Sequence, residues 1–376
     1  MKQIKPFYEP IYITRPLLAP LRQIRKKIKE IWKSKWLTNM GIQHQKLESK
    51  LLKYLDVQNL TLFCNGTLAL EIACRALELK GEVITTPFTF PATVNSLYIN
   101  RLKPIFCDIK INDFTINSDE ITELINPNTS AIMPVHVFGN PCDIEKIAKI
   151  ARNNNLHVIY DAAHCFGVEY KGKGIGNFGD ISMFSFHATK IFHTLEGGAL
   201  TYNNSELKDT FYLLKNFGIN KKNIEEIILP GTNAKLNELQ AAIGLINLSL
   251  IKTEIEKRKY LSSIYRENLN EVEGIKLVNE KKDVKYNYQY FPILIDEGQF
   301  KFNRDHVFEY LKKFNIFSRK YFYPLCTNYQ FLKAFIPSNI PNAEKISNQI
   351  LCLPLYGELA PQDIKQICDI LKSINN

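Results

Sequence analysis

The stretch that decides the fold is His157-Val-Ile-Tyr-Asp-Ala-Ala-His164. A short apolar run that ends in an acidic residue is typical of a buried strand whose carboxyl end lies at a ligand site. Working outward, further short apolar runs alternate with helical patterns, which predicts a mostly parallel sheet with helices on both faces. The expected strands are 60–63, 82–86, 104–108, 131–135, 157–161, 181–185 and 198–202, and the expected helices among them include 67–79, 93–99 and 144–153.

The segments on either side of this region suggest two further parts of the chain. Helices are expected at 22–35 and 45–54, and a long helix at 238–266 is expected to bridge to a second domain. Beyond it, a strand at 290–295 and helices at 305–314 and 361–374 form an α+β pattern. The predicted division is an N-terminal arm and helix at 1–40, a large domain at 41–245, and the bridging helix with a small C-terminal domain at 246–376.

Composition and charge exclude several classes of protein. The 376 residues are 45% hydrophobic and 23% charged, which is ordinary for a globular chain and excludes a disordered, collagen-like or coiled-coil protein. The net charge is +10, and residues 1–36 contribute +8 of it. This arm is compatible with nucleic acid, an anionic membrane surface, an anionic ligand or a solvated helix face. It carries no helix-turn-helix or zinc-finger signature, which disfavours a nucleic-acid partner.

No stretch approaches the roughly 20 apolar residues that span a bilayer, and the first residues lack the apolar core of a signal peptide. We therefore expect a cytoplasmic protein with no membrane partner. The eight cysteines form no CxxC pair, so neither a metal site nor a disulfide framework is expected. Most of these cysteines are expected to be small buried apolar side chains.

The first candidate site is Asn65-Gly66-Thr67, between an expected strand and helix. Backbone N–H groups at a helix start bind anions, and glycine lets an oxyanion approach the backbone. The alternative is an ordinary polar cap of a helix. The segment does not match the Walker A or GxGxxG patterns of nucleotide-binding loops.

Two further candidates follow expected strands. Asp161 ends one strand, and its carboxylate is suited to a metal, a histidine or a protonated ring nitrogen, or else to an N-cap. Lys190 follows another strand and Ser185; burial would make its amine nucleophilic, although most lysines are surface residues. An anion cup, a strand-end acid and then a lysine are the groups that pyridoxal phosphate requires for its phosphate, ring nitrogen and aldehyde.

The chain resembles a known family, the fold-type I, pyridoxal-phosphate-dependent nucleotide-sugar aminotransferases of the DegT–DnrJ–StrS group, from about residue 10 to near its C-terminus. The segments that carry the resemblance are Asn65-Gly-Thr67, Ile84-Thr-Thr-Pro-Phe-Thr-Phe-Pro-Ala-Thr93, Pro134-Val-His-Val-Phe-Gly139, Asp161-Ala-Ala-His164, Ser185-Phe-His-Ala-Thr-Lys190, Glu196-Gly-Gly198 and Gly231-Thr-Asn-Ala-Lys-Leu-Asn237. The resemblance implies an α/β fold with a large domain, whose mostly parallel sheet lies between helices, and a smaller α+β C-terminal domain.

The resemblance also implies roles for individual residues. Lys190 and Asp161 would be catalytic, with Lys190 binding the cofactor aldehyde and Asp161 pairing with the pyridine nitrogen. The other implied cofactor contacts are His164 at the ring hydroxyl, Phe90 stacked on the ring, Gly66, Thr67 and Ser185 at the phosphate, and Asn233 at the phosphate of the other subunit of a homodimer. Sister enzymes that remove a sugar hydroxyl carry histidine at the position of Lys190, so the lysine favours transamination.

The implied reaction transfers an amino group from L-glutamate to a TDP-linked sugar. Ser34–Asn39 and the SFHATK and EGGA segments are most similar to members that act at C4 of TDP-4-keto-6-deoxy-D-glucose, for O-antigen or related glycans. The alternatives are amination at C3 of a 3-keto sugar, another pyridoxal-phosphate activity such as a lyase or decarboxylase, and, more distantly, a nucleic-acid-binding regulator. Further possible contacts are His187, close to the lysine in sequence, and His193, Lys235, Tyr321 and Tyr323 at the substrate.

Overall fold

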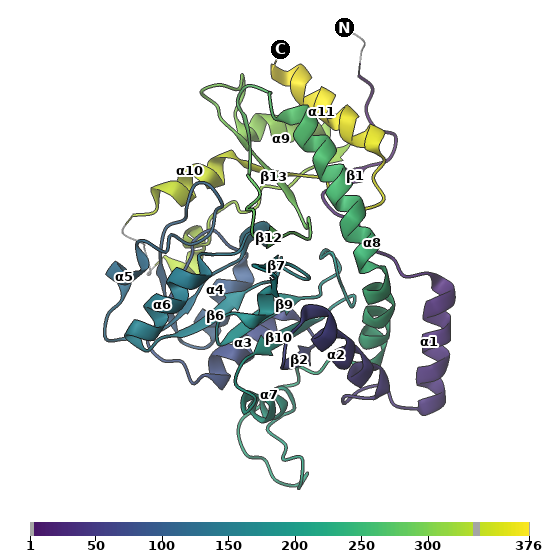
Figure 1. The fold of residues 1–376 in the computed structure, drawn as a ribbon, viewed down its shortest axis with the longest axis vertical. Helices are drawn as coiled ribbons and strands as arrows, with labels where there is room; N and C mark the ends of the chain where they lie inside the picture. The colour runs from purple at the N-terminus through teal and green to yellow at the C-terminus, as the bar shows by residue number, and fades with distance from the viewer. Residues whose placement is uncertain (1–3, 334–338, 376) are drawn as a thin grey trace.

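The computed structural model describes residues 4–333 and 339–375, and its centre is a seven-stranded sheet (Figure 1). The strand order is β2-β10-β9-β6-β5-β3-β4. Strand β10 is antiparallel to β2 and β9, and the other neighbours are parallel, so the predicted mostly parallel sheet is confirmed. The strands are β2 (Leu60–Phe63), β3 (Glu82–Thr85), β4 (Lys103–Phe106), β5 (Thr129–Met133), β6 (His157–Asp161), β9 (Ile181–Ser185) and β10 (Gly198–Tyr202).

Helices cover both faces of this sheet and bury a core on each side. Strand β9 shows the division: the side chain of Met183 packs in one apolar cluster and that of Phe184 in the other, because successive residues of a strand point to opposite faces. The first cluster contains residues of α3, α4 and α7, and the second contains residues of α2, α6 and α8. These helices are α2 (Ile42–Leu55), α3 (Gly66–Ala76), α4 (Pro91–Ile99), α6 (Ile144–Asn154), α7 (Leu207–Lys215) and α8 (Glu238–Leu269).

Helix α8 runs from the central sheet to the C-terminal part of the chain (Figure 1). It begins at a capping box, in which Asn237 and Gln240 exchange side-chain to backbone hydrogen bonds. Beyond it, a three-stranded antiparallel sheet packs with helices around a separate apolar cluster, as the α+β pattern predicts. This part contains β11 (Ile275–Leu277), β13 (Phe291–Ile295), β15 (Ile350–Leu353), α9 (Arg304–Lys312) and α11 (Pro361–Asn375). The domain boundaries at 40 and 245 stay predictions.

Short elements complete the fold. β1 (Ile11–Tyr12) pairs with β14 (Ile316–Phe317), so the N-terminal arm lies against the C-terminal part of the chain. The remaining elements are α5 (Ile121–Leu124), β7 (Glu169–Tyr170), β8 (Lys173–Gly174), β12 (Val284–Lys285), α10 (Pro341–Gln349) and four short 3-10 turns at 137–139, 175–177, 326–328 and 330–332. All eight cysteines are free. Seven of them are buried, and the prediction that most are buried side chains is confirmed. In the two described ranges, no helix is long and apolar enough to cross a membrane.

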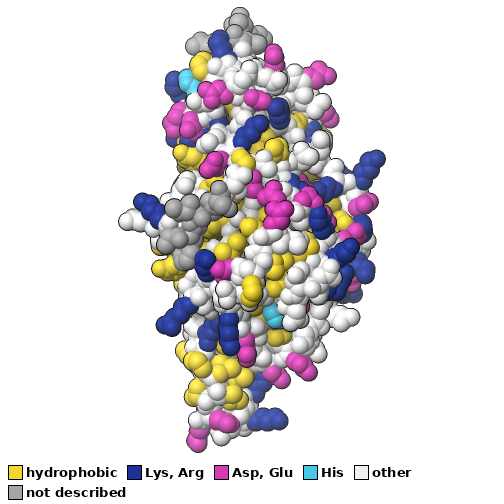
Figure 2. Space-filling view, turned by 90° about the vertical axis from the view of Figure 1, so that its left-hand side faces the viewer, with side chains coloured by type: hydrophobic (Ala, Val, Ile, Leu, Met, Phe, Trp, Pro, Cys, Tyr) yellow, Lys and Arg dark blue, Asp and Glu magenta, His cyan; other side chains and the backbone are white. Residues whose placement is uncertain are grey.

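The amphipathic helix predicted near the N-terminus is α1 (Leu21–Ser34), which lies beside the lower half of α8 (Figure 1). Its apolar face is only partly covered: Ile31 is buried, whereas Trp32 is 60% exposed. Apolar surface is also exposed after α7, at Phe217 and Ile224. Hydrophobic side chains gather at the lower end of the molecule in Figure 2, while charges of both signs are dispersed over the rest of that face.

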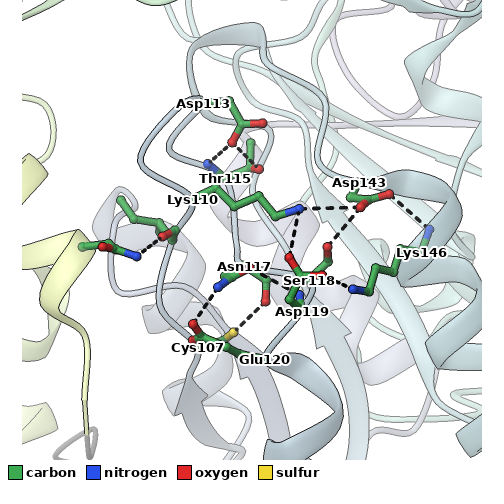
Figure 3. Close-up of polar contacts among 12 residues, drawn as sticks. Cys107, Lys110, Asp113, Thr115, Asn117, Ser118, Asp119, Glu120, Asp143 and Lys146 are labelled. Atoms are coloured by element: carbon green, nitrogen blue, oxygen red, sulfur yellow. Dashed lines mark hydrogen bonds and ion pairs between the residues drawn. The ribbon is translucent and has the colours of Figure 1, made fainter.

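A polar network stabilises the connection between β4 and α6 (Figure 3). Lys110 Nζ lies 3.7 Å from Asp119 and 3.6 Å from Asp143, and the hydroxyl of Ser118 donates to Asp143 at 3.1 Å. Asp143 is also the N-cap of α6, where it accepts from the backbone N–H of Lys146. These bonds tie the segment that directly follows β4 to the start of α6.

Candidate active site

A cavity of about 390 Å³ lies at the carboxyl ends of the central strands. This is the edge at which ligands bind in open α/β sheets. Its wall contains seven of the eight residues that the sequence singles out, contributed by segments up to 124 positions apart. These residues are Gly66, Thr67, Phe90, Asp161, His164, Ser185 and Lys190.

Asp161 is the last residue of β6 and is 4% exposed. One carboxylate oxygen accepts the hydroxyl of Thr93 at 2.7 Å, and the other accepts the N–H of Ala163 at 3.1 Å. Burial raises the pKa of Asp161, and these two bonds together with the charge of Lys190 oppose that effect. A carboxylate held in this way is positioned to pair with a cationic ring nitrogen.

Lys190 lies in an irregular turn after β9. Burial lowers the pKa of its ammonium group to about 8, although nearby Asp161 acts in the opposite direction. A lysine with this pKa is largely cationic at neutral pH but has an appreciable neutral fraction, which is the nucleophilic form. Its Nζ lies 5.8 Å from the ring centroid of Tyr290, which forms part of the same wall.

His164 is held by the backbone. Its Nδ1 accepts the N–H of Phe138 at 3.1 Å, and its ring lies 4.9 Å from that of Tyr290. Burial lowers the pKa of His164 well below its usual value, so the ring is neutral. Because Nδ1 accepts, the proton is on Nε2, which makes this atom a hydrogen-bond donor.

The expected anion cup is formed at the start of α3. Asn65 caps the helix by accepting the N–H of Leu68 at 2.8 Å, whereas the N–H groups of Gly66 and Thr67, at the first two positions of the helix, have no partner within it. A Cβ on Gly198 would lie 2.7 Å from the backbone of Asn65 and Gly66, so glycine is required where β10 passes this turn. Ser185 lines the same part of the cavity. The buried carboxylate, the lysine and this donor-rich turn fit the ring nitrogen, aldehyde and phosphate of pyridoxal phosphate.

Asn233, the eighth expected residue, does not line the cavity of its own chain. It is exposed and accepts a hydrogen bond from Lys235 at 2.7 Å. Its contact across a dimer therefore stays a prediction.

The structure places some of the further possible contacts in the wall of the cavity and others outside it. His187 and Tyr321 line the cavity, and His187 lies 3.4 Å from Glu196. Lys235 and Tyr323 lie outside it. His193 is buried elsewhere, where its ring bonds the carbonyl of Leu17 at 2.8 Å.

Sequence reasoning missed three residues of the wall: Tyr290, Arg319 and Phe322. Tyr290 was expected only as part of a strand, and the other two lie in a segment without a regular pattern. All three are more than 90 positions from Lys190 in sequence. Their positions in the sequence therefore give no indication that they lie near the lysine.

A larger cleft, of about 890 Å³, lies between α8 and the segment around Tyr286. Its wall includes Lys252, Lys259 and Lys281, and Lys281 is paired with Asp113 at 2.6 Å. The lining of this cleft lacks the combination of a helix start, a buried acid and a half-buried lysine. The smaller cavity is therefore the candidate active site.

Comparison with known proteins agrees with this geometry. Residues 21–372 match the model of the DegT/DnrJ/EryC1/StrS aminotransferase family. The chain is 45% identical to a dTDP-4-amino-4,6-dideoxy-D-glucose transaminase of Shigella dysenteriae, over 97% of this chain and 99% of the relative, and 42% identical to an enzyme of the same name from Escherichia coli, over 96% and 98%. Among solved structures, DesI in the presence of its TDP-sugar product superposes with a TM-score of 0.94 at 30% identity, covering 98% of this chain and 94% of DesI. The chain belongs to the DegT/DnrJ/EryC1/StrS aminotransferase family.

Proposed function

We propose that this aminotransferase uses pyridoxal phosphate to transfer an amino group from L-glutamate to C4 of TDP-4-keto-6-deoxy-D-glucose. The product would be TDP-4-amino-4,6-dideoxy-D-glucose. The observation that carries the proposal is that buried Asp161 and half-buried Lys190 line one cavity, on a chain whose relatives of 45% and 42% identity are named as transaminases of this amino sugar. The TDP-sugar product in the DesI structure supports the same class of substrate.

The cofactor supplies an aldehyde that accepts the amino group and a ring that accepts electrons from the reacting carbon. The residues of the chain hold and move protons around it. Lys190 would hold the cofactor through its Nζ, and the same amine would act as the general base that takes the proton from the α-carbon of the donor. The carboxylate of Asp161 would keep a proton on the ring nitrogen, and the Nε2–H of His164 would be the donor for the ring oxygen.

Substrate specificity would then follow from the rest of the wall. Phe90 is 51% exposed at the cavity and offers an apolar face to the cofactor ring. The ring of Tyr321 and the guanidinium of Arg319 lie together, 5.1 Å apart, at the C-terminal side of the same cavity. The same residues would move the protons in the reverse order when a keto sugar takes the place of 2-oxoglutarate. This completes the transfer of the amino group.

We further propose that the active form is a homodimer in which Asn233 of one subunit reaches the phosphate site of the other. Asn233 follows a loop that exposes Phe217, Ile224, Ile227 and Ile228, and hydrophobic side chains gather at this lower end of the molecule (Figure 2). Exposed apolar clusters of this kind mark contact surfaces. A partner that covered this loop would bury the apolar side chains and bring Asn233 near a second cavity.

The test is a turnover assay with the purified enzyme, L-glutamate and each of two keto sugars. TDP-4-keto-6-deoxy-D-glucose should be aminated at C4, with one 2-oxoglutarate formed per sugar. Robust turnover of the 3-keto isomer alone would overturn the C4 assignment. Consumption of an amino acid without any keto acceptor would instead indicate a lyase or decarboxylase.

A further inference from the structure

Gln289 contacts the backbone on both sides of Lys190. Its Oε1 accepts the N–H of Ile191 at 2.6 Å, and its Nε2 donates to the carbonyl of Thr189 at 3.2 Å. The side chain is 1% exposed. A carboxamide carries a donor and an acceptor side by side, so it bonds two neighbouring peptides as another strand would. From these contacts we propose that Gln289 is a positioning residue. It fixes the turn that carries Lys190 and so sets the rate at which Lys190 captures the cofactor aldehyde.

The turn has little regular structure of its own. Residues 186–197 lie between β9 and β10 in neither a helix nor a strand. Within the turn, the N–H of Lys190 donates to the carbonyl of His187 at 2.9 Å, and that of Thr194 donates to Phe186 at 3.0 Å. The two peptides flanking Lys190 bond to Gln289, from a segment 99 positions away. The orientation of the lysine therefore depends on a long-range side-chain contact.

The backbone of Gln289 is itself held by hydrogen bonds to other side chains. Its N–H donates to Oδ1 of Asn287 at 3.1 Å, and its carbonyl accepts from Arg258 at 3.4 Å. Arg258 is buried and paired with Glu254 at 2.6 Å. These bonds fix the backbone of Gln289 and thereby the point from which its side chain reaches the turn.

The same segment also reaches the other half of the site. Nδ2 of Asn287 donates to the carbonyls of His164 and Phe166, at 2.9 and 3.0 Å. Asn287 and Gln289 thus join the loop after β6, which follows Asp161, to the turn after β9, which carries Lys190. This segment, which contains no reacting group, therefore adds a direct link between the two loops that follow β6 and β9.

The inference rests on the proposed role of Lys190 as the lysine that binds the cofactor. The test compares wild type with Gln289→Met, which keeps the length and loses both hydrogen bonds, and with Gln289→Glu, which keeps only an acceptor for Ile191. Gln43→Met is the matched control, because Gln43 is equally buried but its amide donates to Glu30, outside the cavity. Two readouts are used: amide hydrogen exchange of the peptide that contains Ile191 in the cofactor-free protein, and the rate at which added pyridoxal phosphate is captured, followed by its visible absorbance and by borohydride trapping on Lys190.

Gln289→Met should raise the exchange of the Ile191 amide at least tenfold and slow capture by a similar factor, with Gln289→Glu between it and wild type and Gln43→Met unchanged. Exchange and capture at wild-type rates in folded Gln289→Met would overturn the inference. If Gln289→Met does not fold, the comparison of Gln289→Glu with wild type decides in the same way. The variant Lys190→Ala separates the two proposals. If it still traps cofactor like wild type, the proposed role of Lys190 fails. If it loses trapping while the Gln289 variants exchange and capture at wild-type rates, only the role of Gln289 is overturned.

Discussion

The hydroxyl of Thr93, near the start of α4, donates to the carboxylate of Asp161 at 2.7 Å across 68 positions of sequence. Thr93 in turn is 2.7 Å from the hydroxyl of Thr89, so the acid at the base of the cavity is held by a short chain of hydroxyls. The Thr93 bond lowers the pKa of Asp161 against the effect of burial. It therefore favours the ionised form that a protonated ring nitrogen requires.

We expect Thr93→Val to lower turnover roughly tenfold, because a hydrogen bond to a charged group contributes about 1.5–3 kcal/mol. Thr93→Ser, which keeps the hydroxyl, is the control and should stay within about threefold of wild type. Steady-state rates with saturating glutamate and sugar measure the effect. Equal activity of the valine and serine variants would contradict this role for the hydroxyl.

The amine of Lys190 should titrate near pH 8 in the cofactor-free protein, because burial lowers its pKa to about 8. The negative charge of Asp161 raises the pKa of Lys190, so Asp161→Asn should move the midpoint to lower pH. The measurement is the pH dependence of labelling of Lys190 by an amine-reactive reagent, read by mass spectrometry of its peptide. A wild-type midpoint near the ordinary lysine value would show that the amine is solvated.

Gly198→Ala should weaken cofactor binding at least tenfold. The added Cβ would lie 2.7 Å from the backbone of Asn65 and Gly66, and backbone atoms at a helix start have little freedom to move away. Gly298→Ala is the control, since its Cβ would meet only a side-chain oxygen of Asp296 at 3.5 Å. Equilibrium titration of the cofactor-free variants with pyridoxal phosphate gives both affinities. An unchanged affinity of Gly198→Ala for pyridoxal phosphate would contradict the placement of the cofactor phosphate at this turn.

Glu238 holds the start of α2 through hydrogen bonds to its carboxylate, and removal of this carboxylate should destabilise the fold. Its carboxylate is 2% exposed and accepts the N–H groups of Gln43 and His44 at 2.7 and 2.9 Å. Glu238→Gln replaces one charged acceptor by a donor, so we expect a loss of about 2–3 kcal/mol. The thermal midpoint of the cofactor-free protein measures this, and Glu256→Gln, on the exposed side of the same helix, should leave it unchanged. Similar midpoints for the two variants would contradict the prediction.

His136 should make the fold sensitive to acid. Burial lowers its pKa to about 3, and its Nδ1 accepts the N–H of Cys142 at 3.0 Å. Between about pH 6.5 and pH 3 the unfolded state binds a proton at this position that the folded state does not, so stability falls as the pH is lowered through this window. His136→Gln should flatten that dependence in urea unfolding measured at a series of pH values, whereas His306→Gln, at an exposed position, should not.

The local elements could be predicted because their signals are local. Strands β6, β9 and β10 begin and end at the predicted residues, and α8 differs only in its last three. Seven expected site residues meet in one cavity because parallel strands present their carboxyl ends at one edge. The antiparallel direction of β10 was not predicted, because an apolar run of five residues carries no sign of its direction. The exposure of Trp32 was not predicted either, since periodicity gives the apolar face of a helix but not what covers it.

The sequence by itself determined the candidates for the chemistry: a lysine, an acid and a helix start, in an order that matches the needs of pyridoxal phosphate. Only the tertiary structure decided what surrounds them. Gln289 and Tyr290 contact the region of Lys190 from about 100 positions further along the chain, and their own neighbours in sequence give no sign of it. Spacing encodes contacts along one element, whereas contacts between elements depend on how the sheet and its helices pack. The pKa values of Lys190 and Asp161 follow from that packing, because burial is a property of the assembled fold.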